Sequence, residues 1–292
     1  MRWSDRMDSA GLAIALGLFS AVTLAFANLA VKMGSDILVG RAILSSSAAL
    51  MILPAAFVVA PPDAATWTAL AIAIPAHFLY QFCLIRAMQA GDLSLVFPVM
   101  RGLAPLLTAI GALMLLGEGL SLWGWLGLVI ATASVIVFTL PPDGARYTAH
   151  PSGRALFWAG GTAIGVALYN VADARGVRIA PDPFTFIIWL FLVDWICVTM
   201  LAVVTRRRAL AAAVRDKWRY GVAAGACSIL SFGSALYAMS FVEAAKVSAL
   251  RETAVLWAAL MGAHVLKEGL GARRIAAAAT LVAGLGLLQF AG

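Results

Sequence analysis

Two arginines lie deep within apolar stretches of the sequence, where a charge is costly. Arg101 and Arg251 are each inside a stretch long enough to cross a bilayer. An ionisable residue at such a depth costs about 2.5–3.5 kcal/mol on insertion scales, so it normally faces a cavity or a partner. One interpretation is a guanidinium that attracts the carboxylate of a bound molecule. The other is a structural ion pair, for which Glu252 and Glu243 are available partners.

His77, Tyr80 and Gln81 form a polar face that could contact a bound molecule. Their spacing of i, i+3 and i+4 places them on one side of a helix. This is the densest uncharged polar face in the chain. It is equally suited to lining a cavity and to hydrogen-bonding a neighbouring membrane helix, and the sequence leaves both interpretations open.

Asn28 and Asn170 occupy matched positions in two similar segments, and Tyr169 directly precedes the second asparagine. Because both segments keep the asparagine, we predict that the two residues line related walls of one cavity. Tyr237 and Trp257 are predicted to supply apolar walls for the side chain of a bound molecule.

Two further pairs of residues are predicted to shape helices. Pro98 and Pro105 lie seven residues apart in one apolar stretch, where prolines free backbone carbonyls and produce either a static kink or a gate. Glu118 and Glu268 end their stretches directly before a glycine, which is a common way for a helix to end. We therefore predict a structural role for both glutamates.

No set of residues indicates enzyme chemistry. The three histidines lie in different segments, and the sequence has neither an HExxH motif nor a Walker A motif. The three cysteines all lie inside apolar stretches, which suggests neither disulfides nor a thiolate metal site. We predict no catalytic residues, no metal and no cofactor.

The composition is that of an integral membrane protein. Hydrophobic residues make up 63% of the chain and charged residues 12%, against about 45–50% and about 25% in soluble domains. The mean hydropathy is +0.95. The net charge of +7 comes from basic residues that cluster beside the ends of apolar stretches, where they set orientation, so we predict no nucleic-acid partner.

Apolar stretches of about 20 residues, the length a helix needs to cross a bilayer, recur along the whole chain. We predict an all-α, polytopic membrane protein with ten transmembrane helices. Clusters of proline, glycine and aspartate mark the turns between them. The expected helices are 10–33, 37–59, 66–89, 93–117, 120–140, 154–176, 184–205, 218–241, 243–266 and 270–290.

The sequence contains an internal duplication. Residues 97–120 match 247–270 at a single offset (251 − 101 = 268 − 118 = 150), and the match includes the arginine and the glutamate of each copy. Residues 25–34 match 167–176 at an offset of 142 (170 − 28 = 142). Matched charges are informative here because charged residues are scarce in this chain.

The duplication predicts two five-helix repeats, residues 1–140 and 154–292, connected by residues 141–153. Because five is an odd number, the second repeat enters the membrane with opposite polarity. Such inverted repeats are common in transporters, which bind their substrate near the midplane between the halves. We therefore place the predicted cavity between the first, third, fourth, sixth, eighth and ninth helices.

Matched loops of the two repeats differ in basic residues, which predicts the orientation. Residues 60–66 contain none, whereas their counterpart, residues 206–219, contains six. By the positive-inside rule the second loop is cytoplasmic. With ten helices, both termini are then predicted on the non-cytoplasmic side of the inner membrane.

Several segments resemble the ten-helix EamA-type branch of the drug/metabolite transporter superfamily. They are AFANLAVK in the first predicted helix, VGRAIL in the second, and LLGEGLSLWGWLGL with its second copy VLKEGLGARRIAAAATLVAG. The resemblance covers essentially the whole chain and implies export of small metabolites or drugs. Ten-helix members include amino-acid exporters, some of which handle aromatic amino acids. The second copy departs from the pattern, with Lys267 where the first has Gly117.

We predict a transporter that exports small organic metabolites, above all aromatic or other hydrophobic amino acids, by alternating access. The alternatives are a membrane-embedded enzyme acting on lipid-linked substrates, a structural subunit, and an exporter of sugars, nucleotides or drugs. The expected partners are a small-molecule substrate and the lipid bilayer. Proton coupling and facilitated diffusion both stay open, as do a monomer and a homodimer. The possible proton carriers are Asp173, Asp194, Glu243 and Glu252, and none of them stands out.

Overall fold

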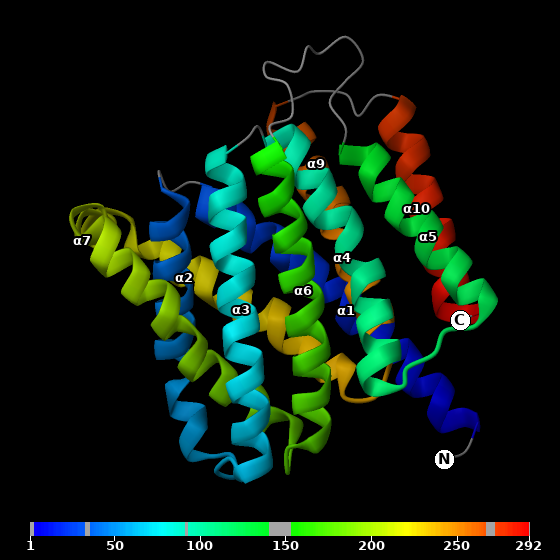
Figure 1. Cartoon of the computed structure of the whole chain (residues 1–292), viewed down its shortest axis with the longest axis horizontal. Coiled ribbons are helices and arrows are strands. Elements are labelled where there is room, and N and C mark those ends of the chain that lie inside the picture. The colour runs from blue at the N-terminus through cyan, green and yellow to red at the C-terminus, as the bar shows by residue number, and fades with distance from the viewer. Residues whose placement is uncertain (1–2, 33–35, 91–92, 140–152, 267–271, 292) are drawn as a thin grey trace.

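The protein is described by a computed structural model that covers residues 3–32, 36–90, 93–139, 153–266 and 272–291. Within these ranges every regular element is a helix, so the predicted all-α fold class is confirmed (Figure 1). The elements are α1 (Trp3–Lys32), α2 (Ile37–Ile52), the short 3-10 helix η1 (Leu53–Phe57), α3 (Ala64–Ala90), α4 (Leu93–Leu116), α5 (Leu122–Thr139), α6 (Gly153–Ile179), α7 (Pro183–Met239), α8 (Ala244–Arg251), α9 (Ala254–Leu266) and α10 (Ala272–Ala291).

Seven helices in the described part of the chain are long and apolar enough to cross a membrane, which makes this a multi-pass membrane protein. They are α1, α2 continued by η1, α3, α4, α6, α7 and α10. The predicted seventh and eighth helices fall together in α7, the ninth is divided, and the apolar part of α5 is shorter. The arrangement of ten crossings in inverted repeats stays a prediction.

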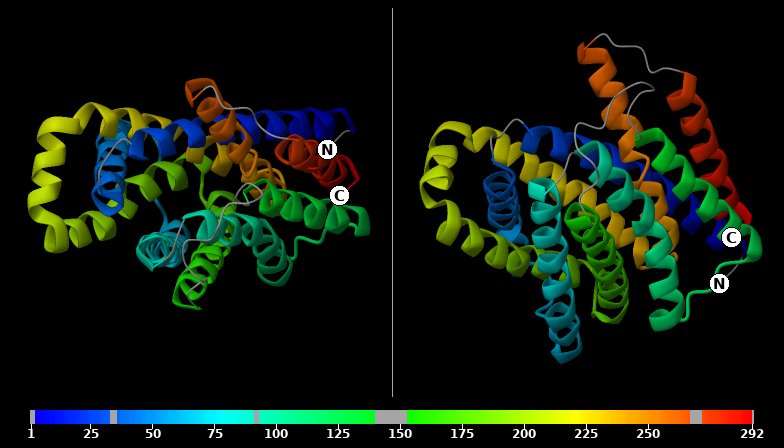
Figure 2. Two further views of the ribbon diagram at one scale, coloured as in Figure 1. Left: turned by 90° about the horizontal axis from the view of Figure 1, so that it is seen from above. Right: turned by 45° about the horizontal axis from the view of Figure 1, so that its top comes forward.

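The segment predicted as a loop between the seventh and eighth helices is itself helical. Within α7 the backbone leaves helical values at Arg206 (φ −136°, ψ 28°) and Lys217 (φ −128°, ψ 15°). These two bends turn the chain back on itself, as Figure 2 shows at the yellow end of the molecule. We call residues 183–205 the first arm of α7 and residues 218–239 the second arm. The alanine-rich sequence between the bends favours helix, which the loop prediction overlooked.

The predicted continuous helix 243–266 is wrong, because the helix is interrupted at Glu252 and Thr253. Both backbone N–H groups donate to the carbonyl three residues earlier, at 3.1 Å, which tightens the turn. The Thr253 hydroxyl donates to the Leu250 carbonyl at 2.8 Å and competes with the regular helical pattern. The break places Arg251 at the end of α8.

Helix α4 ends at Leu116, one residue before the end of the predicted helix 93–117. Gly117 has a φ of +71°, a left-handed conformation that glycine adopts without strain. Gly117 therefore ends this helix. The predicted cap, Gly119, lies two residues further along the chain. Glu268, the matched residue of the second repeat, lies outside the described residues.

The helices pack most extensively as α3 with α6, α2 with α7, and α5 with α10. Glycines allow two of these pairs to approach closely. A Cβ added at Gly165 of α6 would lie 2.8 Å from the Tyr80 Cα of α3. A Cβ added at Gly127 of α5 would lie 2.6 Å from the Gly284 carbonyl oxygen of α10. The α3–α6 contact matters most here, because both helices carry candidate site residues.

The second arm of α7 runs beside α1, where the Ser231 hydroxyl donates to the Ser20 carbonyl at 2.8 Å. This contact connects helices that belong to different predicted repeats. Both labelled chain ends lie at the same end of the bundle (Figure 1).

Candidate functional site

The site is centred on a buried histidine–aspartate pair that joins α3 to α6. His77 Nε2 lies 2.9 Å from Asp173 Oδ2, and the two side chains are 9% and 0% exposed. The close approach of the two helices at Gly165 brings these side chains within hydrogen-bonding distance. The pair therefore joins α3 to α6 through a buried polar contact.

Aromatic rings enclose the imidazole. The His77 ring stacks on Tyr169 with ring centres 4.4 Å apart and an interplanar angle of 17°. Phe232, on the second arm of α7, meets the same imidazole edge-on at 5.3 Å. Tyr80 packs edge-on against Tyr169 at 5.3 Å. The sequence-predicted residues His77, Tyr80 and Tyr169 are therefore brought together.

Arg251 closes this group from α8. Its guanidinium carbon lies 5.0 Å from the centre of the Phe232 ring, a cation–π contact. The residue is 8% exposed, and its Nε has no hydrogen-bond partner in the described part of the chain. A cation at the last residue of a helix also interacts favourably with the helix dipole. We call His77, Tyr80, Tyr169, Asp173, Phe232 and Arg251 the central cluster.

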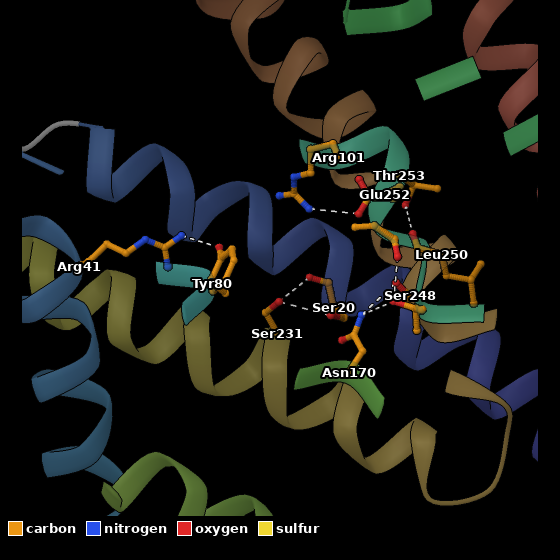
Figure 3. A network of polar contacts seen from close by, with 12 residues as sticks. Ser20, Arg41, Tyr80, Arg101, Asn170, Ser231, Ser248, Leu250, Glu252 and Thr253 are labelled. Atoms are coloured by element: carbon orange, nitrogen blue, oxygen red, sulfur yellow. Dashed lines mark hydrogen bonds and ion pairs between the residues drawn. The ribbon is translucent and has the colours of Figure 1, made fainter. Parts of the chain in front are cut away.

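Gln81 and Arg41 extend the central cluster sideways. The Gln81 amide donates to Asp194 Oδ2, on the first arm of α7, at 3.4 Å. The Arg41 guanidinium of α2 donates to the Tyr80 hydroxyl at 2.6 Å (Figure 3). Polar side chains from α2, α3, α6, α8 and the first arm of α7 thus converge on one region, next to Phe232 of the second arm.

Arg101 has an acidic partner. Its Nη1 lies 3.4 Å from Glu252 Oε1, at the break between α8 and α9 (Figure 3). Both residues line a small pocket between α4, α5, α8 and α10. Pro105 and Thr132 line the same pocket. Of the two interpretations that the sequence left open for Arg101, the structure supplies the partner for the ion pair.

Asn170 is a cross-link between three helices. It is 2% exposed, and its amide nitrogen lies 3.1 Å from both the Thr108 hydroxyl of α4 and the Ser248 hydroxyl of α8 (Figure 3). Its sequence match, Asn28, is exposed on α1. The structure therefore places the two asparagines in different environments, and not on matching walls of one buried space.

The remaining predicted site residues lie elsewhere. The Tyr237 ring stacks on Phe184 at 5.1 Å, and Trp257 is 39% exposed on α9. Pro105 is buried in α4. Pro98 belongs to the same helix, but its side chain falls outside the described residues. Helix α4, which contains both prolines, changes direction along its length in Figure 1.

Glu118 connects the two halves of the chain. Its carboxylate accepts a hydrogen bond from the Arg178 guanidinium of α6 and another, at 2.8 Å, from the Ala244 N–H at the start of α8. The same guanidinium donates to the Met239 and Val242 carbonyls, each at 2.9 Å. These contacts fit the predicted structural role, although they reach well beyond a local turn.

Asp173 and Phe232 were missing from the predicted substrate-binding residues. Asp173 was predicted only as part of the polar face around Asn170 and as a possible proton carrier, although it follows Tyr169 by four residues and so shares its helix face. Phe232 is one of many aromatic residues in an apolar helix, and no sequence signal sets it apart. Arg41 was also missed, although it is a charge inside an apolar stretch.

The chemistry of the site is ionic and aromatic. No group of three or more histidine, cysteine, aspartate or glutamate side chains in the described ranges could hold a metal ion. The Arg251 guanidinium suits an anion, and the rings of Tyr169 and Phe232 suit a flat apolar group. Unpaired oxygens on Asp173 and Asp194 suit a proton or a cationic group.

Comparison with known proteins assigns the broad role. Residues 153–290 match the EamA-like transporter family. A solved structure described only as "Crystal structure of protein" has a TM-score of 0.76 to this chain at 18% identity, with 96% of each chain covered, and this likeness concerns the fold. No curated protein matches the sequence.

Residues 153–290 are thus similar to the EamA-like transporter family, and this similarity points to transport of small solutes across a membrane. The match agrees with the predicted transporter and with the prediction that the chain is not an enzyme. The alternative of a membrane-embedded enzyme is therefore set aside.

Proposed function

We propose that the protein exports small organic solutes that carry a carboxylate, above all aromatic or other hydrophobic amino acids, by alternating access at the central cluster. The proposal depends mainly on Arg251, a buried guanidinium whose Nε lacks a hydrogen-bond partner among the described residues. An unpaired polar atom of a buried charge is costly, so a bound carboxylate would lower the free energy of the site.

The surroundings of Arg251 favour an amino acid with an apolar side chain. Tyr169 and Phe232 present rings next to the guanidinium and the imidazole. A flat side chain could pack against these rings, while Asp173 and Asp194 would attract an ammonium group. The rings now pack against His77, so binding requires α3, α6 and the second arm of α7 to separate.

The helix packing supports the inverted repeat. The match between the repeats exchanges α1 with α6, α3 with the second arm of α7, and α4 with α8 and α9. Helix α3 packs on α6, just as the second arm of α7 packs on α1. Likewise, α4 packs on α6, and α8 and α9 pack on α1. Rocking of one half against the other would then open the site to each side in turn.

The test is exchange of labelled L-phenylalanine by the purified protein in proteoliposomes, followed by L-leucine and by a sugar and a nucleotide. We expect exchange of L-phenylalanine, weaker competition by phenethylamine, which lacks the carboxylate, and none by the sugar or the nucleotide. Arg251→Gln should lower exchange by about tenfold or more, since removing one partner of a buried charge pair costs about 2–5 kcal/mol.

The matched control is Arg175→Gln, which removes an exposed arginine from α6 and should leave exchange unchanged. Full exchange by folded Arg251→Gln, or equal competition by phenethylamine, would show that the substrate carboxylate is not recognised by Arg251. Exchange of the sugar or nucleotide alone would replace the substrate class.

A further inference from the structure

We infer that His77 and Asp173 form a proton-binding site that couples export of the substrate to the entry of a proton. This inference rests on the proposed function and adds a second, ionic substrate to it. The sequence offered several acidic residues as proton carriers without distinguishing between them. The structure singles out one pair by its position and its contacts.

The geometry of the pair suits a shared proton. His77 Nε2 and Asp173 Oδ2 are 2.9 Å apart, within hydrogen-bonding distance, and the carboxylate is fully buried. Tyr169 covers one face of the imidazole, and Phe232 meets it edge-on. Because His77 belongs to the first repeat and Asp173 to the second, a relative movement of the repeats changes this distance directly.

Unpaired acceptors surround the pair. Asp173 Oδ1 and Asp194 Oδ1 are buried, and neither has a hydrogen-bond partner in the described residues. Gln81 Oε1 is likewise buried and without a hydrogen-bond partner in these residues. A buried acceptor without a donor costs about 1–3 kcal/mol. A proton or an ammonium group supplies the missing donors, so this region is prepared for a small cationic species.

The charged groups that face the pair come from three helices. Asp173 of α6, Asp194 of α7 and Arg251 of α8 all act on His77. Arg41 of α2 acts on Asp194, and its guanidinium also donates to the Tyr80 hydroxyl. Two carboxylates and one guanidinium therefore act on His77, and Arg41 further compensates the Asp194 carboxylate.

The phenol groups nearest to the pair are those of Tyr169 and Tyr80. Both interact electrostatically with the Arg101 guanidinium. The Arg101 guanidinium is compensated by Glu252, the other carboxylate at the break between α8 and α9. This second ion pair leaves the charge balance around His77 unchanged. The net charge around the pair therefore changes when the imidazole gains or loses a proton.

The proton step is simple. The neutral imidazole donates from Nε2 to the Asp173 carboxylate, and a proton taken from water converts the imidazole into an imidazolium. The pair then changes from a net charge of minus one to zero, and release of the proton to water reverses the step. In the deprotonated state the ammonium group of an amino acid restores neutrality. Proton and substrate therefore exclude each other, which produces antiport.

The first test is independent of transport. The protein has three histidines, so ¹⁵N-histidine labelling gives few signals, and His77→Gln assigns one of them. We expect the His77 signal to titrate between about pH 5 and pH 8, the range in which histidine changes charge. The midpoint should shift in Asp173→Asn. A His77 signal that stays constant over this range would overturn the inference.

The second test measures coupling. Proteoliposomes with a pH-sensitive dye inside are given an outward gradient of L-phenylalanine. We expect proton entry that depends on the amino acid. In Asp173→Asn the ratio of proton entry to L-phenylalanine exchange should fall by about tenfold, within the usual range for coupling between sites. Glu243→Gln is the matched control, because this partly exposed carboxylate pairs with Lys246 at 3.5 Å, and it should keep the wild-type ratio.

The outcomes separate the two proposals. Exchange of L-phenylalanine without proton entry in the wild type would overturn coupling and leave the proposed function standing. An unchanged ratio in folded Asp173→Asn would also overturn it. If no amino acid is exchanged, the proposed function fails, and a titrating His77 would still support the proton site.

Discussion

Arg101 and Arg251 occupy equivalent positions of the two repeats, yet they have different partners. Arg101 pairs with Glu252, whereas the guanidinium of Arg251 lies over the Phe232 ring. The residue that matches Glu252 in the first repeat is Gly102 (252 − 150 = 102). A Cβ at Gly102 would lie 2.4 Å from the Ile136 side chain, so that position has little room for an acid. One glycine therefore breaks the symmetry of the charges.

The Arg101–Glu252 pair should be detected by a double-mutant cycle. Arg101→Gln or Glu252→Gln leaves a largely buried charge uncompensated, and we expect each to lower the unfolding free energy by on the order of 2 kcal/mol, less than for a fully buried pair. The double variant should recover most of this loss. Thermal unfolding in detergent measures all four proteins. Additive losses in the double variant would show that the two side chains do not interact.

Asp63 provides a pH-dependent contact at the start of α3. Its carboxylate accepts hydrogen bonds from the Thr66 hydroxyl at 2.6 Å and the Thr66 N–H at 2.8 Å. These bonds, the hydroxyl first, hold the pKa of Asp63 below its ordinary value of 3.8. Since the folded-state pKa is the lower one, the stabilisation is present above the ordinary value and is lost as the pH falls through the folded-state value.

We therefore expect wild type to unfold at a higher temperature than Asp63→Ala at about pH 6, with the difference narrowing below about pH 4. Thr66→Val keeps the carboxylate but removes the hydroxyl, so it should show a weaker pH dependence than wild type. A difference between wild type and Asp63→Ala that is the same at about pH 3 and pH 6 would contradict this assignment.

At the scale of single residues, the sequence could predict where charges and polar faces matter but not which partners they find. His77, Tyr80 and Tyr169 do lie together, because helical spacing places polar residues on one face. The partner of Arg101 could not be chosen, since Glu252 and Glu243 were predicted as partners within the second copy, which contains Arg251. That choice depends on the break after Arg251, a feature of the folded chain.

Glycine contacts position the helices that carry the central cluster. Gly161 and Gly165, four residues apart on α6, both face α3. A Cβ at Gly161 would lie 3.0 Å from the Cys83 sulfur, and one at Gly165 would meet the Tyr80 backbone. Small residues at this spacing let membrane helices approach closely. The distance between His77 and Asp173 depends on this approach.

Gly165→Ala should therefore separate α3 from α6 and lower both stability and transport. The Cβ would lie 2.8 Å from backbone, which cannot move aside as a flexible side chain can. We expect a loss of about 1–3 kcal/mol, the usual cost of overpacking. Gly160→Ala is the control in the same helix, because a Cβ there has no neighbour within 4 Å. Equal stability of the two variants would show that the contact of Gly165 with the Tyr80 backbone does not limit the approach of the helices.

Most helices could be predicted from the sequence, because a membrane-crossing helix is recognised by its length and its hydropathy. The predictions were wrong where length and hydropathy do not decide whether a segment is helical. The interruption at Thr253 contains neither glycine nor proline, and its hydroxyl bond to Leu250 is visible only in the structure. The segment between Arg206 and Lys217 is polar and was taken for a loop, but it is helical between two bends.

At the scale of the molecule, the position of the basic residues predicts orientation. Arg206 pairs with Asp36 at 3.1 Å, which brings the basic segment of α7 against the start of α2. The chain ends lie together at one end of the bundle (Figure 1). We expect reporter fusions within residues 206–219 to be cytoplasmic and fusions at both termini to be external. A cytoplasmic C-terminal reporter would reverse the predicted orientation.

The contact of Glu118 with Arg178 and the Ala244 N–H has a consequence for the time course of transport. At the matched positions of the other repeat stand Glu268 (118 + 150) and Asp36 (178 − 142). The duplication thus supplies an acid and a base at one place and two acids at the other. We expect the two openings of the cycle to differ in rate, with the Arg178 end remaining shut for longer. Single-molecule dwell times of that closed state should shorten in Glu118→Gln, and equal dwell times would mean that the duplicated halves still open alike.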